Sequence, residues 1–290
     1  MNSSISRRTG LKMAVAALLA MCPLAALAGG QGTTDNPLRF VVYGDTRDGH
    51  EVHRKLVALM IQQSPEMVWQ TGDLVHKASD PSLWKIYDDI VKDLRKKTQL
   101  YTVRGNHDFG GDGYGERMTS PIESGNKDYY SVTKGNSHLI ALDVDDHSIY
   151  GPGTDQYKWL EADLKKAQST SKHIFVFFHV APYSIGSHGM NPEVQEKLCP
   201  LFIKYGVRIV FNGHDHNYYH TVRNGVTYVV SGGGGAPLYD AYPDKGAIPG
   251  DRYEKVHHYC LVDVKGDDVN VQVIRVDGSL LEKFTVSAKR

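Results

Sequence analysis

Side chains that bind divalent metals follow five separate apolar runs of this 290-residue sequence, each at the point where the run ends. They are Asp45, Asp73, the triplet Asn106-His107-Asp108, His179, and the pair His214 and His216. If each run is a strand, these side chains share the carboxyl edge of a sheet, where open α/β sheets bind ligands. A single polar residue at a strand end is usually a turn or a helix cap, but five such groups together indicate a metal-binding site.

Glycine stands immediately before four of these positions, as Gly44, Gly72, Gly105 and Gly213. A residue without Cβ permits a sharp turn off a strand and a close approach of neighbouring backbone. We therefore expect these glycines to set the metal-binding side chains at the strand ends.

The elements that position these residues follow from the periodicity of the chain. The pattern predicts strands over 38–43, 67–71, 100–103, 138–144, 174–178 and 207–211, and helices over 50–63, 83–97, 155–167 and 192–205. Alternation of nearly continuous apolar strands with helices predicts an α/β domain whose parallel or mixed sheets are covered by helices. The glycine-rich segment 109–127 has no periodicity and indicates a functional loop.

The tail of the chain has a different pattern. From Thr221 onward one predicted strand follows another with turn residues between them, and the segment 269–273 alternates apolar and polar residues. We expect these strands to complete a second sheet that packs on the first.

The composition is that of an ordinary globular protein, with 41% apolar and 23% charged residues, and it excludes collagen, coiled coil and disorder. Lysine plus arginine balances aspartate plus glutamate at 33 each. This balance provides no basic field that would draw the protein onto nucleic acid or an anionic membrane. We therefore expect a small-molecule partner and no nucleic acid as a primary partner.

The N-terminus has the features of a signal peptide. Residues 1–28 carry Arg7, Arg8 and Lys12 but no acid, and the apolar run 13–28 is shorter than the roughly 20 residues of a spanning helix. The segment around the two arginines resembles a twin-arginine export signal, and Ala26-Leu27-Ala28 is typical of a cleavage site. This predicts a periplasmic or secreted protein that uses the twin-arginine export machinery and keeps no stable membrane anchor after cleavage. The alternative is a cytoplasmic protein with a basic, apolar N-terminus.

The predicted domain organisation follows from these boundaries. We expect a signal peptide over 1–28, an N-terminal linker over 29–37 and a single domain over 38–290. The motifs occupy 38–235 of that domain, and C-terminal strands occupy 236–290.

Two cysteines, Cys199 and Cys260, remain after removal of the predicted signal peptide. An oxidising compartment would allow them to pair, whereas free cysteines commonly serve as small buried hydrophobes. The distance between their Cα atoms decides between these states, so the sequence leaves both open.

The five blocks resemble, in order, those of the calcineurin-like metallophosphoesterase superfamily, which includes the purple acid phosphatases. The blocks are Gly44-Asp45, Gly72-Asp73, Gly105-Asn106-His107-Asp108, His179, and Gly213-His214-Asp215-His216. The segment 231–236 is similar to the glycine-rich turn of the same family. The resemblance implies a four-layer α/β/β/α sandwich of two mixed β-sheets flanked by helices, with a dinuclear metal centre.

The resemblance also implies which residues bind the two ions. Asp73 would bridge them, Asn106, His179 and His214 would bind one ion, and Asp45 and His216 would bind the other. These donors suit iron, manganese or zinc, so the identity of the metal stays open. Two ions about 3.5–4 Å apart clamp both the attacking and the leaving oxygen of a phosphoryl displacement.

The same resemblance implies attack by a metal-bridging hydroxide, with His107 as a general acid or a group that holds the phosphoryl oxygens. Asp108 would orient His107 and favour its charged form. Two divalent ions carry a charge of +4, whereas Asp45, Asp73 and a hydroxide together contribute a charge of −3. The surplus positive charge suits a phosphate ester.

The first block departs from the common family pattern, because Arg47 stands where many members have a histidine ligand. Purple acid phosphatases also lack that histidine and supply a tyrosine three residues after the bridging aspartate, where this chain has His76. We therefore predict His76 as the substitute ligand, with a solvent-facing loop histidine as the alternative. Arg47 either binds the substrate phosphate in a bidentate manner or pairs with Asp48 at the surface.

Together these features predict an exported, dinuclear metal-dependent hydrolase of phosphoric ester bonds. A phosphomonoesterase of the acid phosphatase type is favoured, and a phosphodiesterase of the same fold is the nearest alternative. Both stay open because the motifs supply the metal ligands and contain little information about the substrate. A secreted metal- or phosphate-binding protein that lost the reaction is a further alternative. Arg47 would be a first sign of that loss, whereas the retained His107 argues against it.

Overall fold

The computed structural model describes residues 37–290 except 119, 146–147 and 288–290. The predicted signal peptide, and all of the predicted linker except residue 37, lie outside the described residues. The described residues belong to one unit, Thr33–Arg290. Within them, no helix has both the length and the apolar character that a membrane crossing requires.

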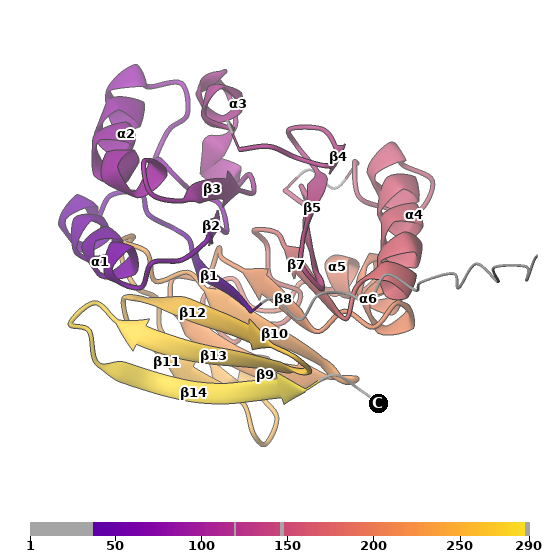
Figure 1. Cartoon of the computed structure of the whole chain (residues 1–290). Helices are drawn as coiled ribbons and strands as arrows, with labels where there is room; N and C mark the ends of the chain where they lie inside the picture. Colours follow the sequence, from indigo (N-terminus) through magenta and orange to yellow (C-terminus); the bar gives the residue numbers. More distant parts are fainter. Residues whose placement is uncertain (1–36, 119, 146–147, 288–290) are drawn as a thin grey trace, which may run out of the picture. The chain divides into compact units, whose positions relative to one another are not determined.

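The first sheet contains six strands in the order β14-β13-β12-β1-β2-β3 (Figure 1). Their bounds are β1 Leu38–Tyr43, β2 Met67–Gln70, β3 Gln99–Thr102, β12 His258–Lys265, β13 Asp268–Arg275 and β14 Leu280–Ser287. Strands β1, β2 and β3 are parallel, whereas β12 pairs antiparallel with β1, so the sheet is mixed. The carboxyl ends of β1, β2 and β3 therefore meet at one edge.

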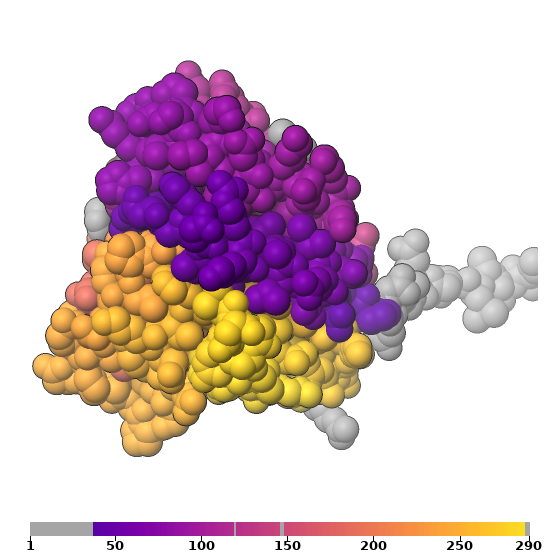
Figure 2. All heavy atoms as spheres, turned by 90° about the vertical axis from the view of Figure 1, so that its left-hand side faces the viewer, coloured from indigo at the N-terminus to yellow at the C-terminus, as the bar shows by residue number. Residues whose placement is uncertain are grey.

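The C-terminal strands β12 to β14 belong to this first sheet, so the prediction that the whole tail completes a second sheet is wrong for them. Val41 of β1 lies opposite Leu261 of β12, and Figure 2 shows the indigo N-terminal part of the fold against the yellow C-terminal part. Alternating apolar residues report which face of a strand is buried. They do not report which edge the strand pairs with, and the sequence therefore could not assign the sheet.

The second sheet contains eight strands in the order β11-β9-β10-β8-β7-β6-β5-β4. Their bounds are β4 Ser124–Gly125, β5 Tyr130–Lys134, β6 Ser137–Ala141, β7 His173–Phe177, β8 Ile209–Asn212, β9 Tyr218–Arg223, β10 Val226–Ser231 and β11 Arg252–Glu254. Strands β6, β7, β8 and β10 run parallel, and the outer strands pair antiparallel. Strand β5 was not predicted from the sequence. The predicted loop 109–127 contains the short helix α3 (Gly113–Arg117) and β4.

Aromatic side chains fill the space between the two sheets. The ring of Trp69 on β2 stacks on Phe177 of β7 with centroids 4.2 Å apart, and Phe40 of β1 meets Phe175 edge-on at 5.2 Å. Along β7 these two phenylalanines alternate with residues such as Val176 that belong to a second core cluster. Successive side chains of a strand point to opposite faces, so β7 is buried on both.

Helices cover the outer faces of the two sheets, with α1 and α2 on one side and α4 on the other in Figure 1. Their bounds are α1 His50–Gln62, α2 Pro81–Arg95, α4 Asp155–Thr170, α5 Pro192–Lys197 and α6 Cys199–Lys204, with 3₁₀ turns at Asn106–Asp108 and Pro243–Lys245. The predicted helix over 192–205 is two helices, because Pro200 lacks the N–H that a continuous helix requires. The predicted sandwich of two mixed sheets flanked by helices is confirmed.

Both described cysteines are buried and unpaired. Cys260 lies in the core that includes the space between the sheets, whereas Cys199 lies in the core between the second sheet and its helices. They therefore serve as buried hydrophobes in two separate cores, and the alternative of a disulfide between them is not realised.

Candidate metal centre

Three of the predicted ligands have a backbone conformation that L-residues rarely adopt. Asp45, Asp73 and His214 have φ angles of 57°, 54° and 71°, in the left-handed region. Such a conformation persists where surrounding contacts enforce it, and it clusters at functional sites. Here the N–H of Asp45 donates to the carbonyl of Gly72 at 3.0 Å, which ties the ends of β1 and β2 together.

Two of the predicted glycines have no room for a side chain. A Cβ on Gly105 would lie 2.4 Å from the backbone N of Asp73, and one on Gly213 would lie 2.5 Å from Asp45 Oδ2. The expectation that glycine permits close approach at these strand ends is confirmed for both. A side chain at either glycine would therefore displace Asp73 or Asp45 from its present position.

Four donor atoms converge between the two sheets, and we call this set the histidine–amide group: Asp73, Asn106, His179 and His214. His179 Nε2 lies 3.2 Å from Asn106 Oδ1 and 3.4 Å from Asp73 Oδ1. His214 Nδ1 lies 3.1 Å from Asn106 Oδ1 and 3.3 Å from His179 Nε2. Atoms that bind one ion at about 2.0–2.2 Å stand roughly 3 to 3.5 Å from each other, so these four donors fit a divalent metal.

The surroundings of His179 fix which ring nitrogen faces this group. Its Nδ1 donates to the carbonyl of Thr71 at 2.7 Å, so Nε2 is the nitrogen that points to the other donors. Burial lowers the pKa of His179, but the charges of Asp73, Asp145 and Asp45 outweigh burial and raise this pKa to about 10. The site thus has a strong negative potential that attracts a cation.

A second set of donors lies beside the first, and we call Asp45, Asp73 and His216 the arginine-side group. One ligand atom from each residue lies within 4.8 Å of the others, and all three residues are buried. His216 Nε2 is 3.5 Å from Asp45 Oδ1, and its Nδ1 donates to the carbonyl of Pro237 at 2.7 Å. This hydrogen bond turns Nε2 toward the carboxylates, so the set fits a second ion that shares Asp73 with the first.

Arg47 extends into the arginine-side group. Its Nε lies 3.2 Å from Asp73 Oδ2 and its Nη2 lies 3.4 Å from His216 Nε2. The guanidinium also pairs with Asp48 through Nη1 at 2.9 Å, so it both faces the centre and makes the predicted pair with Asp48. A fixed positive charge therefore contacts two of the three donors of this group.

His76 lies apart from both groups. Its side chain is 55% exposed, and its Nδ1 lies 3.0 Å from Asp48 Oδ2. Arg47 contacts the same carboxylate oxygen, so Asp48 links the two residues at the rim of the centre. The ligand role of His76 stays a prediction.

His107 stands at the rim of the centre. Its backbone N–H donates to Asp73 Oδ1 at 3.0 Å, and its ring Nδ1 donates to the carbonyl of His76 at 2.7 Å. The other ring nitrogen, Nε2, lies 4.0 Å from Asp73 Oδ2, and the side chain is 27% exposed. Nε2 is therefore the nitrogen that can exchange a proton with a substrate at the centre.

Asp108 makes contacts other than those expected. Its Oδ1 accepts the N–H of Leu74 at 3.0 Å, and its Oδ2 accepts the N–H of Gly105 at 2.9 Å. Among the described residues no hydrogen bond joins its carboxyl group to His107, because the side chain is buried beneath the 3₁₀ turn that carries both residues. Burial raises the pKa of Asp108 to about 8, and the charge of Asp73 adds to this rise. Asp108 therefore holds the loops of the centre together. The prediction that its carboxyl group orients His107 by a direct contact does not agree with these hydrogen bonds.

Two aromatic contacts support the ligand histidines. The ring of Tyr239 stacks on His216 with centroids 4.1 Å apart, and the ring of His188 lies 3.8 Å from that of His214. The N–H of His188 donates to Asp215 Oδ1 at 2.9 Å. The sequence did not indicate Tyr239, because it lies in an irregular segment without a pattern.

Asp145 is a further acidic residue whose charge acts on the centre, because it raises the pKa of His179, and the sequence did not indicate it. Burial raises the pKa of Asp145 to about 7, although the charge of His179 lowers it. Asp145 follows the end of β6 by a few residues, as the predicted ligands follow their strands. The signal that identified those ligands could therefore have identified Asp145.

Comparison with known sequences assigns the family. The sequence profile described as "Calcineurin-like phosphoesterase" matches residues 38–218. The chain belongs to this family. The match spans the strands that carry the candidate centre, and it confirms the superfamily that the five blocks predicted.

Purple acid phosphatases are among the curated relatives of this chain. "Purple acid phosphatase 15" of Arabidopsis thaliana is 30% identical over 182 residues, which are 56% of this chain and 34% of the relative. The chain spans about a third of the length of the first curated relatives that it matches. These matches agree with the prediction of a hydrolase that acts on phosphoric ester bonds.

Solved structures share the fold. A purple acid phosphatase from yellow lupin (Lupinus luteus) seeds superposes with a TM-score of 0.76 at 20% identity, covering 88% of this chain and 54% of that one. GAP50, described as the anchor in the inner membrane complex of Plasmodium, has a TM-score of 0.71 at 16% identity, covering 88% of this chain and 90% of that one. At these identities the likeness concerns the fold alone.

Proposed function

We propose that this phosphoesterase hydrolyses phosphate monoesters at a centre that holds two divalent metal ions. The observation that carries the proposal is the convergence of the histidine–amide group, in which four pairs of donor atoms lie 3.1–3.4 Å apart. When bound, the two ions would supply Lewis-acid activation of the phosphoryl group and a nucleophile near neutral pH. Iron, manganese and zinc all suit the donors.

The residues of the chain bind and orient the ester around this centre. Asp73 belongs to both ligand groups and accepts the backbone N–H of His107, so it sets the position of that histidine relative to the reacting phosphorus. His107 Nε2 would give its proton to the leaving alkoxide. Its Nδ1 is held by the carbonyl of His76, which keeps the ring from turning away during this transfer.

Charge favours a monoester over a diester. A phosphate monoester is largely dianionic near neutral pH, because the second pKa of phosphate is about 6, whereas a diester carries one charge. The guanidinium of Arg47 contacts both Asp73 and His216 and adds a permanent positive charge beside the ions. We therefore expect Arg47 to turn toward the phosphate when a substrate binds, where it can donate two hydrogen bonds.

A pair of esters tests the proposal. The purified protein is loaded with manganese, zinc or iron, its metal content is measured, and turnover of p-nitrophenyl phosphate is compared with turnover of the bis ester. We expect preference for the monoester, with about two ions per chain. The variant His107→Ala should lower kcat by about 10²- to 10⁴-fold. Asp89→Asn, a change of an exposed carboxylate on α2, is the matched control and should leave turnover unchanged.

Two outcomes contradict the proposal. Preference for the bis ester would assign the chain to the phosphodiesterases. Binding of fewer than two ions together with no turnover of either ester would favour a metal- or phosphate-binding protein.

We further propose that the protein acts outside the cytoplasm, after export through the twin-arginine machinery to the periplasm or the medium. The support is in the sequence of residues 1–28, with Arg7-Arg8 before an apolar run. Replacement of both arginines by lysine should retain the protein in the cytoplasm of the expressing bacterium, as cell fractionation would show. Equal amounts outside the cytoplasm for both forms would contradict this route.

A further inference from the structure

The guanidinium of Arg47 has one partner that belongs to neither ligand group. Its Nε and Nη2 contact Asp73 and His216, for which an ion in the arginine-side group would compete. Its Nη1, on the other side of the guanidinium, donates to Asp48 Oδ2 at 2.9 Å. The pair between Arg47 and Asp48 can therefore persist when the centre is occupied, because it uses no atom that binds metal.

His76 holds the carboxylate of Asp48 from the other side. Its Nδ1 donates to the same oxygen, Oδ2, at 3.0 Å, so two donors fix the orientation of this carboxylate. The contact between His76 and His107 uses the backbone carbonyl of His76, which accepts His107 Nδ1 at 2.7 Å. The side chain of His76 can therefore be replaced without removal of a group that holds the predicted general acid.

The backbone around Asp48 is tied to the centre and to α1. Asp48 has a φ angle of 68°, in the left-handed region that aspartate tolerates better than most residues. The N–H of Arg47 donates to the carbonyl of Asp73 at 3.3 Å, and the N–H of Gly49 donates to the carbonyl of Arg47 at 2.8 Å. The carbonyl of Gly49 accepts the N–H of His53 on α1 at 2.9 Å. The fold therefore sets where the Asp48 carboxylate lies relative to the centre.

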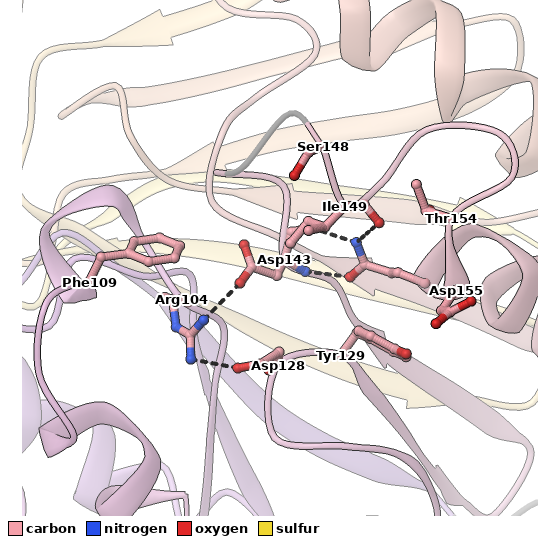
Figure 3. A pocket seen from close by; sticks show the side chains of 10 residues that line it. Arg104, Phe109, Asp128, Tyr129, Asp143, Ser148, Ile149, Thr154 and Asp155 are labelled. Carbon is pink, nitrogen blue, oxygen red and sulfur yellow. Dashed lines mark hydrogen bonds and ion pairs between the residues drawn. The ribbon is translucent and has the colours of Figure 1, made fainter.

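A second arginine near the metal-binding loops has a different arrangement. Figure 3 shows the guanidinium of Arg104 between Asp143 and Asp128, to which it donates at 3.2 and 2.5 Å. Among the described residues no hydrogen bond or ion pair joins this guanidinium to a predicted metal ligand. Arg104 thus has two carboxylate partners outside the ligand groups, whereas Arg47 has one and directs its other nitrogens to the centre.

We infer that Asp48 is a positioning residue for Arg47: its carboxylate, held by His76, keeps the guanidinium at the centre, where Nε and Nη2 donate to the phosphoryl oxygens of a bound ester. An arginine side chain loses much rotamer freedom when it binds a ligand, and a fixed partner at Nη1 reduces that loss. Asp48 acts through Arg47 and contacts neither the ester nor the ions. The inference rests on the proposed hydrolysis of monoesters, since it specifies how the phosphate is held.

The sign of the effect on phosphate binding tests the inference. Asp48→Ala removes a negative charge near the centre, so it would strengthen phosphate binding if the carboxylate acted through its charge alone. Positioning predicts the opposite, a dissociation constant of inorganic phosphate that rises by about five-fold. Asp48→Asn retains an acceptor oxygen and should raise the constant by about two-fold only. Calorimetric titration of the metal-loaded full chain with inorganic phosphate measures these constants.

Turnover of p-nitrophenyl phosphate gives a second readout. KM should rise in Asp48→Ala by about the same factor while kcat changes less than KM, because Arg47 would hold the phosphate in the ground state and in the transition state alike. His76→Ala should raise KM by about two-fold and retain both ions. Asp128→Ala is the matched control, because it removes a carboxylate that is 45% exposed, against 39% for Asp48, from Arg104. It should leave phosphate binding unchanged.

A double-mutant cycle separates positioning from a general disturbance of the centre. Arg47→Ala should itself weaken phosphate binding, and addition of Asp48→Ala to it should have no further effect, because Asp48 acts through Arg47. Metal content and Tm are measured for every variant. If Asp48→Ala lost an ion or failed to fold, the comparison of Asp48→Asn and His76→Ala with the parent protein would decide.

Tighter or unchanged phosphate binding in Asp48→Ala would overturn the inference. An equal loss of affinity from Asp48→Ala in the presence and in the absence of Arg47 would also overturn it. Loss of an ion in His76→Ala would show that His76 is a metal ligand and does not serve to hold Asp48. Failure of the proposed function has a different signature, because no monoester would be hydrolysed although inorganic phosphate could still bind and report on Asp48.

Discussion

The two ligand groups of the centre share Asp73 but differ in what surrounds them. In the histidine–amide group, four pairs of donor atoms stand 3.1–3.4 Å apart, and His179 takes part in three of these pairs. In the arginine-side group three donors lie within 4.8 Å of one another, and the guanidinium of Arg47 contacts two of them. The donor atoms of the first group already face one another at distances that suit a metal ion. In the second group, an incoming ion competes with the guanidinium of Arg47 for the same donors.

This difference predicts unequal affinity for the two ions. A guanidinium cannot lose its charge at physiological pH, so an ion that enters the arginine-side group meets a fixed positive charge. The histidine–amide group experiences the opposite field, because Asp73, Asp145 and Asp45 raise the pKa of His179. We therefore expect the first ion to bind in the histidine–amide group and the second to bind more weakly beside Arg47.

The largest effect is expected from the residue that the two groups share. Asp73→Asn removes a carboxylate charge from both, so metal content should fall below one ion per chain and turnover should fall by about 10³-fold or more. Metal analysis by mass spectrometry and hydrolysis of p-nitrophenyl phosphate measure these effects. A variant that retained both ions would show that the groups do not share this residue as proposed.

Removal of one histidine from each group separates the two. His214→Ala should abolish tight binding of the first ion and lower turnover by about 10³-fold, whereas His216→Ala should leave about one tightly bound ion per chain. Titration with manganese or zinc, followed by calorimetry, distinguishes the two variants. If both variants lost the same ion with the same affinity, the proposed order of binding would be wrong.

Replacement of the competing cation should strengthen the weaker group. Arg47→His removes the fixed charge and introduces a metal-binding ring, so the dissociation constant of the second ion should fall by about ten-fold. Arg54→His, at an exposed position on α1, is the matched control. Unchanged or weaker binding in Arg47→His would show that Arg47 turns away from the donors and does not compete with the ion.

The smallest effect is a release of protons when the first ion binds. The folded-state pKa of His179 is raised to about 10 from the ordinary 6.5, so at pH 8 the imidazole is protonated before it binds metal. Binding should therefore release about one proton per first ion, and calorimetry in two buffers of different ionisation enthalpy measures it. In chelator-treated protein the same shift stabilises the fold below pH 6.5, and this stabilisation is lost as the pH rises through 10. His179→Asn should abolish both effects.

Much of the fold and of the candidate site was predictable because local features encode it. The predicted strand over 38–43 has the bounds of β1, and the predicted helix over 50–63 extends one residue beyond α1. Gly105 and Gly213 marked the close approaches that the structure contains. Periodicity and glycine placement are local consequences of burial and of backbone sterics, so they are visible in a single sequence.

Contacts between distant segments were not predictable in the same way. The expected bond from Asp108 to His107 is absent among the described residues, because Asp108 is buried and bonds to the backbone of Leu74 and Gly105. The direction of Arg47 was left open between phosphate and surface, and the side chain contacts Asp73, His216 and Asp48. The long side chain of arginine has many rotamers, and its surroundings in the fold select among them.

By itself the sequence determined the order of the five blocks, the strands that precede them and the family to which the chain belongs. Only the tertiary structure decided which donors meet, because Asp73 and Asn106 follow strands of the first sheet and His179 and His214 follow strands of the second. The packing of the two sheets brings these loops to one edge. Packing depends on long-range burial of aromatic side chains such as Trp69 and Phe177, which local periodicity does not record.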